Sequence, residues 1–426
     1  MFSDKMSIRQ SALAKPLILL ALTLLLSACG GGSAPGTGTT PGTPTTPGTP
    51  GTPGTTPQTP TTGDCAVTID GVKDITIPTK LVNSASSCDY LIDGVLEVTS
   101  VLSIEPGTVI QFGQDSSVYI SSGGVLEAVG TPNARIRMEG RLKTKGYWNG
   151  ISFNGARPSR IEYTDIESAG QTGPYKNYAA ISGIDGTLSF KNSSISGSYA
   201  SGMVISEDNR LLISDFANNV FYDNLGYGLR VSATQTTILD AGSDYLGTSK
   251  GQPNGLPYIK IDWDDVYGDT TWHKLNAPYY ASIALYYLGG LLTIEPGVKI
   301  VMDQDTSFNV HKGGAIHAVG TAAEPIIFTG EKAERGYWNG LDFFYSNSSK
   351  NLLDHVQVQY GGGGGANVYV GNGSYLKIQN SLLAHSYSVG LCLDSINVGS
   401  ANASVDVGSG MTYQDNPDGN VNLECG

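Results

Sequence analysis

The chain has 426 residues and a net charge of −13; 56 residues are Gly, 20 are Pro and only 15% are charged. So few charges and so many turn-forming residues argue against a helical protein and favour short strands joined by turns. An acidic surface repels phosphate backbones, so nucleic acid is not expected as a partner.

The first 28 residues have the pattern of an export signal. Basic residues precede an apolar run over residues 16–26, which is too short to span a bilayer as a helix. The run ends in Leu26-Ser27-Ala28-Cys29, which resembles the lipobox of bacterial lipoproteins. The resemblance implies that Cys29 is acylated and becomes the mature N-terminus, and Gly30 at the next position implies sorting to the outer membrane. An ordinary secretory peptide with a chance Cys is the alternative.

Residues 30–63 consist almost wholly of Gly, Thr, Pro and Ser. No apolar side chain there could support a core, so the segment is expected to stay disordered and to act as a tether. The acyl chains on Cys29 would supply the multiple anchors that stable membrane attachment requires. The expected location is therefore the outer membrane, on its periplasmic side or at the cell surface.

The rest of the chain contains an internal repeat. Residues 102–153 align with residues 292–343 at a constant offset of 190 and without gaps. The pentapeptide Gly146-Tyr147-Trp148-Asn149-Gly150, for example, returns as Gly336-Tyr337-Trp338-Asn339-Gly340. The predicted parts of the chain are a signal peptide over residues 1–28, the lipidated Cys and its tether over 29–63, copy one with an N-terminal cap over 64–250, and a connector with copy two and a C-terminal cap over 251–426.

Within each copy the pattern is one of short strands and turns. Val109-Ile110-Gln111-Phe112 and Ile136-Arg137-Met138 alternate with period two, and Gly-rich turns such as Gly123-Gly124 separate segments of this kind. Closely spaced short strands fit a sandwich, a barrel or a β-helix, and the small number of residues between strands favours the β-helix.

The order of the motifs is more specific than the strand pattern. In each copy, Leu-x-Ile-Glu-Pro-Gly is followed by Gly-Gly, then Ala-Val-Gly-Thr, then Gly-Tyr-Trp-Asn-Gly. This order resembles the pectin-lyase-like β-helices of bacterial surface proteins. The resemblance implies an all-β fold, a right-handed parallel β-helix solenoid made of two tandem copies, with on the order of 14 coils.

Four cysteines remain besides Cys29, namely Cys65, Cys88, Cys392 and Cys425. Export permits disulfides, and of the three pairings Cys65–Cys88 with Cys392–Cys425 closes the shortest loops. Such bridges would fasten the two ends of the solenoid. A structural metal site would need thiolates at CxxC-type spacing, which the sequence lacks.

Two sets of residues are candidates for glycan binding. A basic strip in copy one, absent from copy two, could bind an acidic glycan, although a solvated sheet edge would have the same composition. The repeated tryptophans are expected to be structural, because a functional site normally occurs once, but they could instead stack on sugar rings. The candidate residues are Arg135, Arg137, Arg141, Lys143, Trp148 and Trp338.

Four carboxylates in the connector, Asp262, Asp264, Asp265 and Asp269, are the candidate metal ligands. They could hold Ca²⁺, which takes six to eight oxygen ligands, but their spacing departs from the EF-hand loop. An acidic turn is the alternative. Apart from Ca²⁺ no cofactor is expected.

No catalytic residue is predicted. Lyases and glycosidases with this fold need clustered Asp residues and a basic residue, or paired carboxylates, and none of their motifs occurs in register. The predicted function is therefore non-catalytic: a membrane-anchored lipoprotein that presents a β-helix surface for binding or adhesion to a polysaccharide, a surface protein or another envelope component. The alternatives are a polysaccharide lyase or glycoside hydrolase, and a structural surface-layer element.

Overall fold

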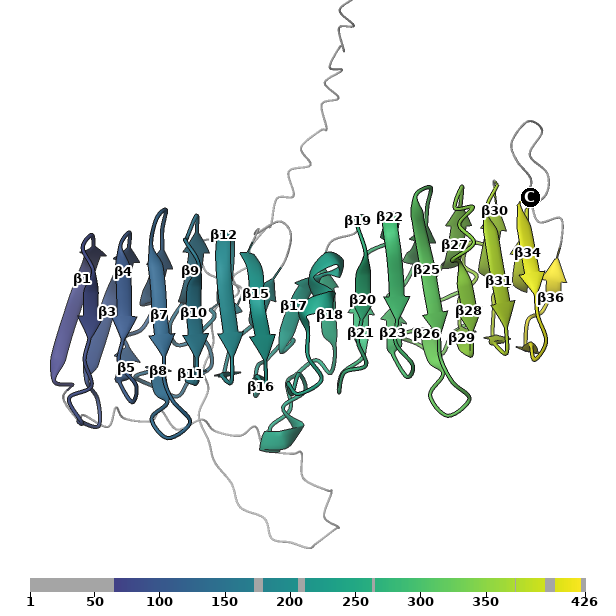
Figure 1. The fold of residues 1–426 in the computed structure, drawn as a ribbon. Helices are drawn as coiled ribbons and strands as arrows, with labels where there is room; N and C mark the ends of the chain where they lie inside the picture. The colour runs from purple at the N-terminus through teal and green to yellow at the C-terminus, as the bar shows by residue number, and fades with distance from the viewer. Residues whose placement is uncertain are drawn as a thin grey trace, which may run out of the picture. The chain divides into compact units, whose positions relative to one another are not determined.

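The computed structural model describes residues 65–171, 179–205, 211–262, 265–371, 373–394 and 403–422. These residues form a parallel β-solenoid of about 13 turns with two parallel sheets, which confirms the predicted fold class. The coils follow one another in chain order from β1 (Val67–Ile75) to β36 (Gly419–Asn422) (Figure 1). Among the described residues, no helix is long and apolar enough to cross a membrane.

Each strand pairs in parallel with a strand of the next coil, so that successive coils build ladders, which we number first, second and third. In copy one the first ladder contains part of β3 (Tyr90–Val98), then β5 (Val109–Phe112), β8 (Ile136–Gly140), β11 (Thr164–Glu167), β13 (Ser194–Ser196) and β16 (Val220–Tyr222). The second contains β1, β3, β6 (Ser117–Ile120), β9 (Gly150–Asn154), β12 (Ala179–Lys191), β14 (Ser201–Ile205) and β17 (Leu229–Ser232). The third contains β2 (Thr79–Leu81), β4 (Val101–Ile104), β7 (Val125–Val129), β10 (Ser159–Glu162), β12 and β15 (Leu211–Ala217).

Copy two repeats this arrangement. Its first ladder contains β21 (Tyr279–Ala281), β23 (Lys299–Met302), β26 (Ile326–Gly330), β29 (Val356–Gln359), β32 (Leu382–Ala384) and β35 (Thr412–Gln414). Its second contains β19 (Asp265–Tyr267), β22 (Leu285–Ile294), β24 (Ser307–Val310), β27 (Gly340–Phe344), β30 (Ala366–Gly371), β33 (Val389–Leu393) and β36. Its third contains β20 (Thr270–Trp272), β22, β25 (Gly314–Val319), β28 (Leu352–Asp354), β31 (Tyr375–Gln379) and β34 (Ser404–Val407).

The core is a column of apolar side chains inside the coils. Side chains alternate between interior and surface along each strand, and the parallel register places equivalent interior positions on one another. One such stack in the first ladder of copy one consists of Ile110, Met138, Ile166, Ile195 and Phe221, each at most 2% exposed. The period-two pattern of the sequence is therefore the interior–surface alternation of the solenoid.

The last glycine of the repeated pentapeptide allows two coils to approach closely. Gly150 opens β9 with a φ of 99°, and Gly340 opens β27 with a φ of 120°. A Cβ atom would lie 2.4 Å from the carbonyl oxygen of Ala180 in the first case and 2.4 Å from that of Ala366 in the second. Only glycine meets both demands, since it has no Cβ and adopts positive φ without strain.

At the junction, the second ladder of copy one leads by parallel pairing into the first ladder of copy two. β17, in the second ladder of copy one, pairs with β18 (Ile259–Asp262), which pairs in turn with β21 in the first ladder of copy two. Between β17 and β18 the chain forms two 3₁₀ helices, η2 (Ala233–Ile238) and η3 (Thr248–Lys250). The second-ladder surface of copy two therefore does not continue that of copy one, which the constant sequence offset did not predict.

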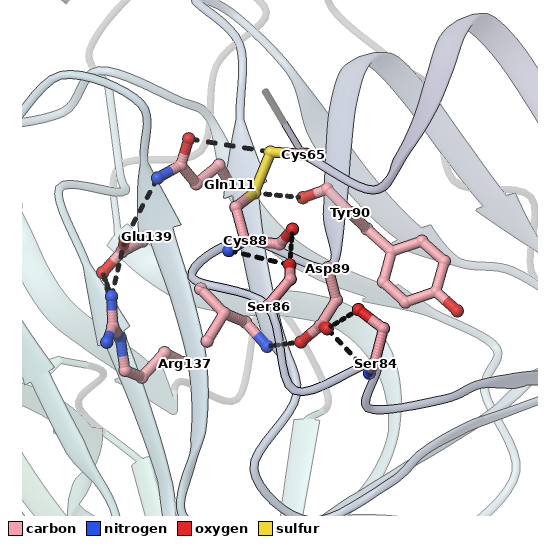
Figure 2. Close-up of a disulfide and its surroundings, with 10 residues drawn as sticks. Cys65, Ser84, Ser86, Cys88, Asp89, Tyr90, Gln111, Arg137 and Glu139 are labelled. Carbon is pink, nitrogen blue, oxygen red and sulfur yellow. Dashed lines mark hydrogen bonds and ion pairs between the residues drawn. A yellow bond between two sulfur atoms is a disulfide. The ribbon is translucent and has the colours of Figure 1, made fainter. Parts of the chain in front are cut away.

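A disulfide joins Cys65 to Cys88 at the first coil, the pairing that the loop-closure argument favoured (Figure 2). Figure 2 shows the Sγ atom of Cys65 facing Gln111, whose Oε1 atom is 3.8 Å away, while Nε2 of Gln111 donates a hydrogen bond to Glu139 at 3.4 Å. The Asp89 carboxylate beside the disulfide accepts a hydrogen bond from the backbone N–H of Val109 at 2.8 Å. The bridge thus ties the residues before β1 to the segment that leads into β3.

Candidate functional site

A row of polar and aromatic side chains follows the second ladder of copy two. The register aligns Asn309 on β24, Asp342 on β27, Tyr369 on β30, Cys392 on β33 and Asn422 on β36. The residues flanking them on each strand, such as Leu341 and Phe343 around Asp342, are buried in the core. Since side chains alternate, the aligned row faces outward, with neighbours about 4.8 Å apart along the solenoid.

A cavity of about 640 Å³ lies over this row. The side chains that matter for its chemistry are Ser307, Asn339, Asp342, Phe344, Tyr369 and Ser388. Its volume is within the range of small-molecule sites, which commonly combine apolar walls with a few polar groups. The structure therefore offers a concave site on one surface of copy two.

Among the described residues that line this cavity, Asp342 supplies the carboxyl group. It is half-buried, and no hydrogen bond or ion pair joins its side chain to another described residue. Burial disfavours the charged form and raises the pKa of Asp342 to about 7. The carboxyl group thus changes charge near neutral pH while facing a space that a ligand could fill.

Aromatic residues lie near Asp342, with Phe344 on the same strand and Tyr369 opposite Asp342 on the next coil. The ring centroids of Phe344 and Tyr369 are 5.4 Å apart, and His311 lies 5.5 Å from Phe344 on the other side. The hydroxyl of Tyr369 donates a hydrogen bond to Oδ2 of Asp394 at 2.7 Å, which fixes the ring. Burial raises the pKa of Tyr369 and lowers the pKa of His311, so that both side chains are neutral around pH 7.

Copy one lacks this combination of residues. At the offset of 190, Ser152 stands where copy two has Asp342. The register then pairs Ser152 with Ser182, in the way that it pairs Asp342 with Tyr369. The sequence analysis did not predict the cavity, although it expected a functional site to occur in one copy only. The difference between Ser152 in copy one and Asp342 in copy two was the signal that could have indicated it.

The basic strip of copy one is largely neutralised by carboxylates of the protein itself. Arg135 contacts both carboxylate oxygens of Asp165, at 2.7 and 2.9 Å. Lys143 bridges Glu139 at 2.9 Å and Glu167 at 2.6 Å. Burial alone would raise the pKa of Asp165, but the hydrogen bonds from Arg135 and Ser194 lower it. These cations stabilise neighbouring coils.

Arg137 and Arg141, the other two cations of the strip, differ in their partners. Arg137 also pairs with Glu139, at 3.0 Å, so one carboxylate serves two cations. Arg141 makes no ion pair with any described residue. The strip therefore offers an acidic glycan far less free positive charge than its sequence indicates.

The tryptophans cannot act as sugar platforms, so that reading of Trp148 and Trp338 is wrong. Both side chains are 0% exposed, and their indole N–H groups donate hydrogen bonds of 2.9 Å to the backbone carbonyls of Glu167 and Gln359 respectively. Trp148 also stacks on Phe112 with centroids 3.8 Å apart. The repeat preserves them because each ring fills the core and bonds to the next coil.

The acidic connector residues do not form a metal site within the described part of the chain. Asp262 pairs with Arg230 at 2.7 Å, and Asp269 accepts a hydrogen bond from the backbone N–H of Leu291 at 2.8 Å. Asp265 lies exposed on β19, and Asp264 is outside the described residues. The described residues as a whole contain no group of three or more His, Cys, Asp or Glu side chains that could hold a metal ion.

Two other predicted sites fall partly or wholly outside the described residues. Cys392, which lines the cavity, is disulfide-bonded, and its predicted partner Cys425 is not among the described residues. The lipidation candidate Cys29 is likewise outside them.

The fold defines the class of protein as a parallel β-solenoid, and the cavity over Asp342 is a concave site on copy two. Residues 267–386 match a family model described as a pectate-lyase like β-helix domain. The cavity residues Ser307, Asn339, Asp342, Phe344 and Tyr369 fall inside the matched range. No curated protein and no solved structure matches the chain. The match supports the β-helix fold for this part of copy two and agrees with the resemblance in the order of the motifs.

Proposed function

We propose that the protein is a lipid-anchored component of the bacterial cell envelope whose solenoid binds a saccharide, and that the cavity of copy two is the binding site. The observation that carries the proposal is the position of the cavity over an outward row that differs from copy one at Asp342 and Tyr369. Because copy one folds without these two side chains, the stability of the solenoid does not require them in copy two.

The chemistry of the lining suits a saccharide. Sugar rings present flat C–H faces that pack on aromatic rings, and Phe344 and Tyr369 supply such rings at the cavity wall. Hydroxyl and amide groups of Ser307, Asn339 and Ser388 can exchange hydrogen bonds with sugar hydroxyls. The combination of apolar walls with a few polar groups is typical of sites that bind small polar ligands.

Binding is favoured over catalysis by what the lining residues lack. A lyase needs a basic residue to take a proton, and the described residues that line the cavity include no Lys or Arg. A glycosidase needs two carboxyl groups on either side of the scissile bond, whereas Asp342 is the one carboxyl residue among the described lining residues. The pKa of Asp342, about 7, is nevertheless that of a general acid, so glycoside hydrolysis is the second candidate.

The proposal is tested on the full chain, purified in detergent, with a glycan array. Replacing Asp342→Ser together with Tyr369→Ser gives copy two the residues that copy one has, and is expected to abolish binding without unfolding the solenoid. The matched control replaces Ser152→Ala together with Ser182→Ala in copy one and should bind like the wild type. Equal binding by the wild type and the Asp342→Ser, Tyr369→Ser variant would remove the cavity from the proposal.

Two further measurements complete the test. Release of shortened products or new reducing ends from a bound glycan would favour the hydrolase. Incorporation of labelled palmitate into the wild type, but not into a Cys29→Ser variant, is expected from the lipid anchor; equal labelling of both chains would contradict it.

A further inference from the structure

We infer that the ligand of the cavity is an amino sugar whose protonated amine pairs with the Asp342 carboxylate. The inference rests on the proposed function and narrows it, since it names the group on the saccharide that the site selects.

The first argument is the missing partner of Asp342. Other carboxylates on the surface of the solenoid meet cations of the chain, as Asp165 meets Arg135 and Asp262 meets Arg230. Asp342 has no such partner among the described residues, although its burial makes an uncompensated charge costly. A cationic group on the ligand would supply what the chain does not.

The second argument is the character of the surrounding side chains. The described residues that line the cavity include no Lys, Arg or His, so an anionic sugar such as a uronate would meet no positive charge from them. The rings of Phe344 and Tyr369, whose centroids are 5.4 Å apart, line the same cavity as the carboxyl group, and aromatic faces attract ammonium groups. A carboxylate that shares a cavity with two aromatic rings favours an amine over a hydroxyl or an N-acetyl group.

The titratable groups near Asp342 differ in whether they can change charge around neutral pH. On the β24 side, His311 has a pKa lowered by burial; on β30, the pKa of Tyr369 is raised. On β33, Cys392 is in a disulfide, and Asp394 accepts the hydrogen bond from Tyr369. Asp342 is thus the group that gains or loses a proton when a cation enters the cavity, since an adjacent positive charge lowers the pKa of a carboxyl group.

The experiment compares three tetrasaccharides that differ at one substituent: β-linked glucosamine, its N-acetylated form and the corresponding glucose oligomer. Calorimetry at pH 6 keeps the amines protonated, while Asp342, with a pKa of about 7, is mostly protonated in the free protein. The glucosamine oligomer is expected to bind about tenfold or more tightly than the other two. Its binding should cause a net release of protons, at most about one per site, measured in two buffers of different ionisation enthalpy, because Asp342 must ionise.

The variant Asp342→Asn keeps the size and hydrogen-bonding capacity of the side chain but not its charge. It should lose the preference for the glucosamine oligomer and the proton release, so that the glucosamine and glucose oligomers bind with similar affinity. Equal affinity of the three oligomers for the wild type, or a preference that survives in Asp342→Asn, would overturn the inference and leave saccharide binding standing. Absence of binding by all three would also overturn it, and the glycan array then decides the proposed function separately.

Discussion

Replacing Trp148 is the sharpest test of how the coils are held together. The indole is fully buried, stacks on Phe112 with centroids 3.8 Å apart, and donates a hydrogen bond of 2.9 Å to the carbonyl of Glu167 on the next coil. Truncating a buried Trp to Ala in a packed core costs about 3–5 kcal/mol, a range that includes the loss of packing and of the hydrogen bond. Trp148→Ala is expected to lower the free energy of unfolding by this amount.

The variant Trp148→Phe separates the two contributions. It keeps a ring against Phe112 but removes the N–H donor, so we expect a loss of about 1–2 kcal/mol. Urea unfolding followed by far-ultraviolet circular dichroism measures both variants, with Tyr267→Ala as control because that ring is 63% exposed. A loss below about 1 kcal/mol for Trp148→Ala, similar to the control, would refute the structural role of the ring.

The remaining predictions concern one glycine and two carboxylates. Gly340→Ala should destabilise the fold severely, because its Cβ would lie 2.4 Å from the Ala366 carbonyl oxygen; unchanged thermal unfolding would contradict the close approach. The pKa of Asp165 is lowered in the folded state, so its pair with Arg135 should stabilise the protein above about pH 4 and lose its effect as the pH falls below that value. The free energy of unfolding of Arg135→Ala should therefore depend less on pH in this range than that of the wild type. The same pH dependence in both proteins would refute the role of the pair. The pKa of Asp342 is raised, so the folded state should lose stability as the pH rises from about 4 to about 7. The variant Asp342→Asn should therefore have a higher melting temperature than the wild type at pH 8 but not at pH 4. Equal shifts of the melting temperature at both pH values would contradict the burial of this carboxyl group.

The fold was predictable because its signals are local and occur twice. Period-two segments such as Val109–Phe112 and the glycine of each Gly-Tyr-Trp-Asn-Gly unit are visible without knowing which coils meet. The pairing at the junction, from the second ladder of copy one to the first ladder of copy two, was not predictable. It depends on the chain between β17 and β18, which replaces strands with the 3₁₀ helices η2 and η3 and has no counterpart in the repeat.

The site was not predictable from the sequence, because its members come from different coils. Asp342 and Tyr369 are separated by a turn of the solenoid whose length sets the register, and no motif announces that they are neighbours. The basic strip failed as a prediction of free charge for the same reason. Asp165, the partner of Arg135, lies 30 residues further along the chain and meets it only after the next coil has formed.

Hydrogen–deuterium exchange with and without the glucosamine tetrasaccharide tests most directly whether copy two alone carries the binding site. Slower exchange is predicted at β27 and β30 on addition of the sugar, with no change at the equivalent strands β9 and β12 of copy one. Protection at β9 and β12, or at both pairs of strands equally, would contradict the account.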